Sequence, residues 1–191
     1  MKNFDIANVL DIESTCYAGD EFPEGELREP IQIGLCEVNL KSLTVLKKRS
    51  FPIKPLTPTI SPYCTALTGW THAKLMKQGF EFKQVLSLLR KLGSRNRLLI
   101  VDSDNELAII RSHCARLGLE DPFGADVSML NVSTIFNLAK RQEINISLEQ
   151  KLAAFNMQFA GIPHRAEDDA HNIALLFFAL TEHLRLMFPA E

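Results

Sequence analysis

The hydrophobic pattern changes part-way along this 191-residue chain, and that change restricts the folds that the chain can adopt. The segments 4–13, 30–40 and 43–55 alternate apolar with polar residues and are separated by turn residues, which is typical of strands in a meander. After a proline-rich stretch, apolar residues recur at helical spacing, and the short, continuous apolar segment 97–101 is typical of a buried central strand. A meander followed by alternating helices and strands predicts an α/β domain, in which helices flank a mixed sheet that is part antiparallel and part parallel.

The second part of the chain supplies the helices of this domain. One helix is predicted over 71–93 and another over 106–118, the latter with Leu117 among its inward-facing residues. The remaining predicted elements are a short strand near 125–130, two helices near 132–141 and 147–155, and a last helix from about 166 to 187. No repeat, low-complexity tract or linker interrupts the pattern, so we expect a single domain over residues 1–191.

The charge balance limits the partners of the chain. A formal net charge of −2 excludes the large basic surface of a protein that coats duplex nucleic acid. It permits an enzyme that binds a few nucleotides at a strand end with the help of metal cations. The four cysteines are scattered without a CxxC pair, as expected for reduced thiols in a cytoplasmic protein. No apolar run approaches the roughly 20 residues of a membrane span, so we expect no membrane partner.

Asp11 and Glu13 form the first acidic pair. They lie two residues apart at the end of the first predicted strand, so their carboxylates project from the same face. Two carboxylates on one face repel each other unless a cation lies between them. A solvated strand end would also account for the pair, and the Asp-x-Glu pattern alone is weak evidence for a metal site.

Two further acidic segments follow. Asp102 and Asp104 come directly after the short apolar strand, where an aspartate also suits the start of a helix. Asp168 and Asp169 lie in the first turn of the last predicted helix, where acids complement the helix dipole without any other function. The helix dipole does not explain His164, just ahead of that helix, although a lone histidine in such a loop is more often a surface residue.

The three segments together are far more specific than each one alone. Asp-x-Glu on a first strand, an aspartate after a central strand and His-x-Ala-x-x-Asp at the start of a last helix occur in that order. This order resembles the DEDDh class of 3′-to-5′ exonucleases, which have a ribonuclease-H-like fold with a mixed five-stranded sheet. Within that class the chain is most similar to the Eri-type (enhanced RNA interference) exonucleases, through DIESTC at 11–16, IQIGLCEV at 31–38, ISPYCTALTGWT at 60–71 and HRAEDDAHNIA at 164–174.

The resemblance implies a metal-dependent 3′-to-5′ exonuclease that acts on single-stranded RNA, with DNA as an alternative, and releases nucleoside 5′-monophosphates. It implies His164 as the general base, and contacts of Glu13, Ser14 and His164 with the terminal nucleotide. Of the two acids after the central strand, Asp104 fits the spacing to the next helix better, while Asp102 stays an alternative. The resemblance further implies two divalent cations, Mg²⁺ or Mn²⁺, bound by four acids: Asp11, Glu13, Asp104 and Asp169.

General chemistry agrees with these roles. Carboxylate oxygens suit Mg²⁺ or Mn²⁺ better than zinc, and two such cations can activate water and stabilise a leaving oxyanion. A histidine can take up the proton of that water near neutral pH. Leu67 as an apolar wedge and Trp70 as a stacking platform are candidates for contacts with the terminal bases, although a lone tryptophan is more often part of a core.

Two other functions stay open. One is a related DEDDh role, either the degradation of short oligonucleotides or polymerase proofreading. The other is a catalytically silent exonuclease fold that binds RNA or protein. The complete set of four acids and a histidine argues against a silent fold, because a buried acid cluster costs several kcal/mol without a cation. The pattern leaves the oligomeric state and any protein partner open.

Overall fold

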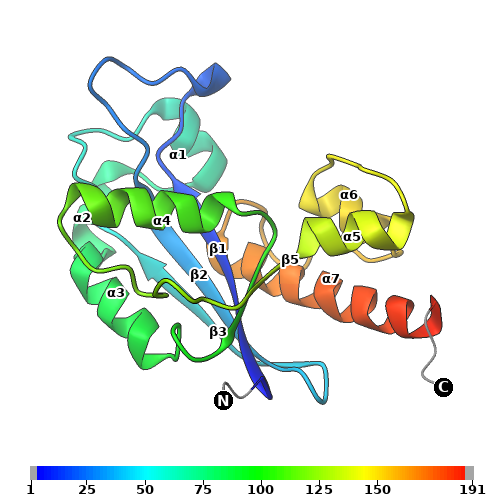
Figure 1. Cartoon of the computed structure of the whole chain (residues 1–191). Helices are drawn as coiled ribbons and strands as arrows, with labels where there is room; N and C mark the ends of the chain where they lie inside the picture. The colour runs from blue at the N-terminus through cyan, green and yellow to red at the C-terminus, as the bar shows by residue number, and fades with distance from the viewer. Residues whose placement is uncertain (1–3, 188–191) are drawn as a thin grey trace.

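The structure, a computed structural model, describes residues 4–187 and is built around one sheet (Figure 1). The order of the five strands is β3-β2-β1-β4-β5, with β1, β2 and β3 antiparallel and β1, β4 and β5 parallel. The mixed sheet predicted from the sequence is therefore confirmed. The strand bounds are β1 (Ile6–Ser14), β2 (Pro30–Asn39), β3 (Thr44–Pro52), β4 (Leu98–Val101) and β5 (Met129–Asn131).

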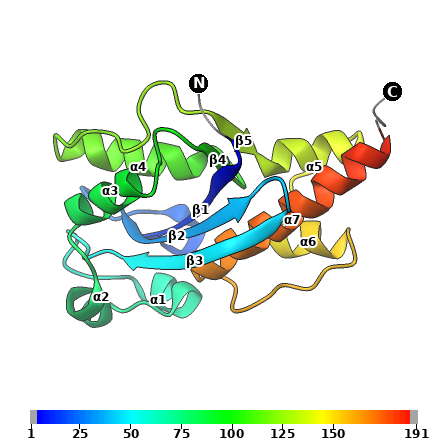
Figure 2. The ribbon, with the colours of Figure 1, turned by 90° about the horizontal axis from the view of Figure 1, so that it is seen from below.

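Helices cover both faces of this sheet (Figures 1 and 2). α3 and α4 pack on one face, and α5, α6 and α7 pack on the other. The helix bounds are α1 (Pro62–Thr68), α2 (His72–Gln78), α3 (Phe82–Lys91), α4 (Asn105–Arg116), α5 (Val132–Lys140), α6 (Leu148–Ala153) and α7 (Ala166–Met187), and a 3-10 turn, η1, spans Ala18–Asp20.

The alternation of side chains along β1 divides the core into two layers. Ala7 and Val9 pack with α5, α6 and α7, whereas Leu10 packs with α3 and α4. Asp11 and Glu13 continue the face of Ala7 and Val9 because they keep the same two-residue period. The two acids of β1 therefore lie on the face of the sheet that α7 covers.

The segment predicted as one helix over 71–93 consists of two helices, so the prediction is wrong at the break between them. Phe80, at the break, forms a parallel bridge with Ile53, the residue that follows β3. A Cβ on Gly79 would lie 2.5 Å from the carbonyl oxygen of Leu75, so the close turn there requires glycine. A pairing with a distant segment interrupts the helix, and the local spacing of apolar residues contains no sign of it.

α1 is a second difference from the sequence prediction, which contained no helix between β3 and α2. Its signals are local: Ser61 caps the helix by accepting a hydrogen bond from the N–H of Cys64 (2.9 Å), and Pro62 occupies the first turn. Leu117, expected to face inward, is 39% exposed because α4 has already ended at Arg116.

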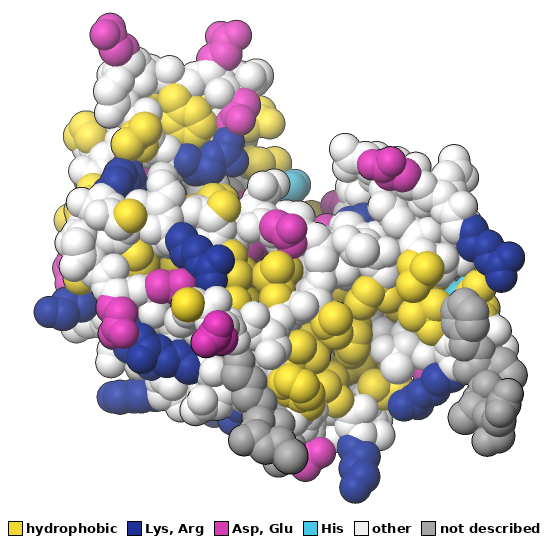
Figure 3. All heavy atoms as spheres, viewed as in Figure 1, with side chains coloured by type: hydrophobic (Ala, Val, Ile, Leu, Met, Phe, Trp, Pro, Cys, Tyr) yellow, Lys and Arg dark blue, Asp and Glu magenta, His cyan; other side chains and the backbone are white. Residues whose placement is uncertain are grey.

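β1 and β4 run parallel, so their carboxyl ends lie at the same edge of the sheet. On the side toward which β1 points in Figure 1, the surface has a notch between the part over α1 and α4 and the part over α5 and α6 (Figure 3). Between residues 4 and 187, no helix combines the length and the apolar character needed to cross a membrane.

Candidate active site

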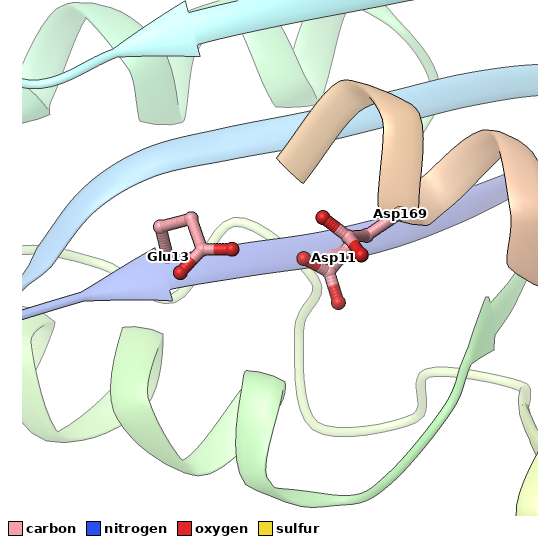
Figure 4. Close-up of side chains that lie close together, drawn as sticks. All are labelled: Asp11, Glu13 and Asp169. Carbon is pink, nitrogen blue, oxygen red and sulfur yellow. The ribbon is translucent and has the colours of Figure 1, made fainter. Parts of the chain in front are cut away.

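Three carboxylates meet where β1 and α7 come together (Figure 4). Asp11 and Glu13 come from β1, and Asp169 comes from the first turn of α7. One oxygen from each carboxylate lies within 4.8 Å of the others. Among residues 4–187, this is the one group of three or more metal-ligating side chains that lie so close together. Segments from opposite ends of the chain therefore form one acidic cluster.

A glycine of β2 permits the close approach of α7 to the sheet. Gly34 lies opposite Asp11 in the β1–β2 register, and a Cβ on Gly34 would lie 1.9 Å from the carbonyl oxygen of Ala166. Any other residue at position 34 would displace the start of α7. The absence of a side chain there brings Asp169 to its position beside Asp11.

A buried glutamine of β2 fixes the same helix start. Gln32 is fully buried, and its side-chain oxygen accepts hydrogen bonds from the backbone N–H of Ala166 (3.3 Å) and the indole N–H of Trp70 (2.9 Å). Its side-chain nitrogen donates to Glu167 (2.5 Å) and to Ser50 (2.9 Å). The amide of Gln32 thus uses both its donor and its acceptor to hold the first turn of α7.

The electrostatics of the acidic cluster favour protons or cations. Burial, followed by repulsion from Asp169, raises the pKa of Asp11 well above its usual value and the pKa of Glu13 to about 8. Burial likewise raises the pKa of Asp169 to about 7, and its Oδ2 atom is buried without a hydrogen-bond partner among the described residues. Buried carboxylate oxygens without donors are the ligands that Mg²⁺ and Mn²⁺ prefer, so the cluster fits divalent cations.

His164 stands at the edge of the cluster. Its Nδ1 atom lies 3.9 Å from Oε1 of Glu13, and its side chain is 48% exposed. The backbone of His164 has a φ of +60°, in the left-handed region that non-glycine residues seldom adopt. The next residue, Arg165, anchors this turn by donating a hydrogen bond to the carbonyl oxygen of Thr68 at the end of α1. The imidazole therefore lies beside Glu13 and remains accessible to a ligand.

The two acids after β4 lie outside this group of three. Asp102 is bound by Lys151, a buried lysine whose ammonium lies 2.8 and 2.7 Å from the two carboxylate oxygens. Asp104 is exposed and accepts a hydrogen bond from Asn131 (3.0 Å). Three of the four predicted metal-binding acids are thus brought together, and Asp104 is not among them.

The sequence matches a known family over most of its length. The model of the exonuclease family (RNase T type) matches residues 9–177, which include the three clustered acids and His164. The chain belongs to the exonuclease family. A comparison with curated protein sequences finds no match.

Solved structures share the fold of this exonuclease. The nuclease domain of 3′hExo, a DEDDh family member bound to rAMP, matches with a TM-score of 0.81 and 23% identity, covering 94% of this chain and 92% of that chain. Cell-death related nuclease 4 (CRN-4) matches with a TM-score of 0.75 and 21% identity, over 94% of this chain and 64% of that one. E. coli Exonuclease I in complex with a dT13 oligonucleotide matches with a TM-score of 0.72 and 16% identity, over 96% of this chain and 42% of that one. These likenesses confirm the ribonuclease-H-like fold.

A pocket of about 270 Å³ adjoins the acidic cluster of the exonuclease. We call it the α4 pocket, because the first half of α4 forms one of its walls. Trp70 lies elsewhere, in a separate hollow of about 300 Å³ beside Arg165. Three residues predicted to contact the substrate, Glu13, Ser14 and Leu67, line the α4 pocket together with Ile12, Cys16, Arg28, Ser103, Asn105, Glu106 and Ile109.

The structure adds three polar residues that the sequence analysis did not select. Glu106 is 9% exposed, and burial raises its pKa to about 7 against the opposing effect of hydrogen bonds from its own backbone and from Ser103. Gln32 could have been noticed as a polar residue inside an apolar strand. Lys151 gave no comparable signal, because a lysine in a short helix is usually exposed.

Proposed function

We propose that this chain is a DEDDh-type exonuclease that removes nucleoside 5′-monophosphates from the 3′ end of single-stranded RNA, using two divalent cations, Mg²⁺ or Mn²⁺. The observation that carries the proposal is the meeting of Asp11, Glu13 and Asp169 within 4.8 Å, with His164 at their edge. The family match and the shared fold support it, since related folds have been solved with rAMP and with a dT13 oligonucleotide.

Each residue of the site has a role in this proposal. Asp11, Glu13 and Asp169 would hold the cations, and Asp104, which is exposed at the start of α4, would complete the ligand set of the second one. When bound, the cations would activate the attacking water and stabilise the leaving oxygen. The imidazole of His164 takes the proton of that water.

The α4 pocket receives the terminal nucleotide in this proposal. Glu13 and Ser14 belong both to the acidic end of β1 and to the wall of the pocket, so a nucleotide in the pocket has its phosphate end at the cluster. Leu67, on α1, offers an apolar surface to the base. Trp70 donates its indole N–H to Gln32, which favours a structural role over stacking with a base.

We further propose that the chain is a single exonuclease domain of the Eri-type branch. The support is the segment ISPYCTALTGWT at 60–71, which lies on α1 and its connection to α2 and is not required by the acid chemistry. The fold of the described residues forms around one sheet, in agreement with a single domain.

The test is an exonuclease assay with 5′-labelled single-stranded RNA and DNA of the same sequence, in Mg²⁺, in Mn²⁺ and in EDTA. We expect a ladder that shortens from the 3′ end only when a divalent cation is present. Asp11→Ala and His164→Ala should abolish the ladder. Glu120→Gln is the control, because Glu120 forms an exposed ion pair with Arg95 away from the site.

Three results would contradict the proposal. Intact strands under every cation, combined with retained RNA binding, would instead support a silent exonuclease fold. Cleavage that survives Asp11→Ala would move the active site elsewhere. A strong preference for dinucleotides over longer strands would indicate the degradation of short oligonucleotides.

A further inference from the structure

The α4 pocket contains a buried acid that the proposed mechanism does not use. Glu106 lies in the first turn of α4 and is 9% exposed, as buried as Glu13 and Ser14 on β1. All three residues line the same pocket of about 270 Å³. Burying a carboxylate in the wall of a cavity costs desolvation free energy. A ligand that donates a hydrogen bond to the carboxylate offsets part of that cost.

The position of the acidic cluster determines which part of a nucleotide approaches this wall. A phosphate at Asp11, Glu13 and Asp169 lies at the β1 end of the pocket. The sugar is the group attached directly to that phosphate, so it enters the pocket first. It then lies between β1, with Glu13 and Ser14, and the first turn of α4, with Glu106.

The apolar side chains that line the pocket are suited to contact the base of the nucleotide. Leu67 of α1 and Ile109 of α4 both line the pocket, and Ile109 lies one turn beyond Glu106 along α4. Flat apolar faces of a base pack well against such side chains, whereas sugar hydroxyls need polar partners. We therefore expect the polar first turn of α4 to contact the sugar and the apolar residues to contact the base.

We propose that Glu106 accepts a hydrogen bond from the 2′-hydroxyl of the 3′-terminal nucleotide and thereby makes the enzyme prefer RNA over DNA. This inference rests on the proposed exonuclease function. A carboxyl group keeps at least one oxygen that accepts hydrogen bonds, and the 2′-hydroxyl is a donor that DNA lacks. With a terminal deoxynucleotide the buried carboxylate loses this partner, which disfavours DNA binding.

Glu106 retains capacity for this contact. Its Oε2 atom accepts a hydrogen bond from Ser103 Oγ at 3.0 Å, and backbone N–H groups of Ser103 and Glu106 contribute further donors. A carboxylate has about four acceptor positions on its two oxygens, so these contacts leave room for a ligand. The same contacts would also suit a purely structural role at the helix start, which the experiment must separate from substrate recognition.

The experiment uses one RNA oligonucleotide in three versions that differ only at the 3′-terminal sugar: ribose, 2′-deoxyribose or 2′-O-methylribose. The measurement is kcat/KM for release of that first nucleotide in Mn²⁺. For the wild-type protein we expect the ribose version to react roughly tenfold or more faster than the deoxy version, the effect of one hydrogen bond to a charged group. The 2′-O-methyl version should resemble the deoxy version, because it has no hydroxyl to donate.

Glu106→Ala should lower the ratio of ribose to deoxy rates to about one by slowing only the ribose substrate. Glu106→Gln should retain part of the preference, because its amide oxygen still accepts a hydrogen bond. Glu120→Gln should leave the ratio unchanged. The ratio is insensitive to partial unfolding, because both substrates are measured on the same protein.

An unchanged ratio of ribose to deoxy rates in Glu106→Ala, or a wild-type ratio near one, would refute the role of Glu106 but not the exonuclease function. So would an equal loss on both sugars together with a higher Mn²⁺ requirement, which would make Glu106 a metal ligand. Absence of release from every oligonucleotide would instead refute the exonuclease function, and with it this inference.

Discussion

Without divalent cations, the protein should lose stability as the pH rises, because its site carboxylates must ionise inside a buried cluster. Burial raises the pKa of Glu13 from 4.5 to about 8 and the pKa of Asp169 from 3.8 to about 7. A carboxyl group with a raised pKa in the folded state favours the fold while it is protonated. Its contribution is complete below the unfolded pKa of about 4 and is lost as the pH rises through the folded pKa of 7 to 8.

Glu13 sets the scale of this effect. The difference between about 8 and 4.5 is about 3.5 pKa units, and each unit is worth about 1.4 kcal/mol. Ionisation of Glu13 in the fold therefore costs up to about 5 kcal/mol. Because the clustered carboxylates titrate together, we expect the free energy of unfolding to fall by roughly 2–5 kcal/mol between pH 5.5 and 8.5 in EDTA. A cation at 100 times its Kd should restore about 2.7 kcal/mol.

The assay is urea unfolding of the wild type and of Glu13→Gln, in EDTA and in Mn²⁺, at several pH values. The glutamine is neutral and similar in shape, so the variant should be more stable than the wild type at pH 8.5 in EDTA and about equal at pH 5.5. The difference between the two proteins cancels the contribution of His113, whose pKa is lowered to about 4 by burial. That contribution has the opposite sign, since it grows as the pH rises from about 4 to 6.5.

The reasoning is refuted if the difference between wild type and Glu13→Gln does not change with pH in EDTA. It is also refuted if Mn²⁺ stabilises the wild type no more at pH 8.5 than at pH 5.5, because cations must compete with protons for the same oxygens.

Three other substitutions test the support around the site. Gly34→Ala should destabilise the fold by about 2 kcal/mol or more and weaken Mn²⁺ binding in calorimetry, because the added Cβ would lie 1.9 Å from a backbone oxygen of α7. Lys151→Met should cost about 3 kcal/mol in urea unfolding, because it leaves Asp102 without its buried cation; a cost below 1 kcal/mol would contradict the pairing. Trp70→Phe should remove the hydrogen bond to Gln32 and part of the packing of the ring, lowering stability by about 1 kcal/mol or more with kcat and KM on RNA unchanged, whereas a stacking role would raise KM.

The sequence predicts most of the sheet because strand patterns here reflect burial on one or both faces. The segment 97–101 is continuous and apolar, and it forms β4, a parallel strand inside the sheet between β1 and β5. The break at Gly79 was not predictable in the same way. It depends on the pairing of Phe80 with Ile53, a contact between segments that local periodicity does not relate.

The site likewise combines features that local sequence patterns predict with features that depend on tertiary contacts. Asp11 and Glu13 share a face through the period of a strand, so their proximity follows from the sequence. The arrival of Asp169 depends on the missing side chain of Gly34 and on the buried amide of Gln32, which are tertiary facts. The sequence indicated Asp169 only because the order of its acidic segments resembles that of a known family.

The choice between Asp102 and Asp104 shows most clearly what a sequence lacks. Both follow β4, and spacing alone separates them weakly. Lys151, far along the chain on α6, forms a buried ion pair with Asp102 and so satisfies that carboxylate. Asp104 has a single amide partner, Asn131, and lies exposed, so it can reorient at little cost. The ion pair therefore favours Asp104 as the acid available to a second cation.

The fold neutralises Asp102 and Asp168, two other partly buried acids near this face, and leaves the cluster uncompensated. Asp168, adjacent to Asp169 in sequence, pairs with Lys48 at 2.5 Å, and this contact helps to lower its pKa. In residues 4–187, no lysine or arginine forms an ion pair with Asp11 or Asp169. If these acids served only packing or helix capping, a basic partner would stabilise them as it does Asp168. Their unpaired charge is instead what a site for divalent cations requires, because the cations themselves provide the compensation.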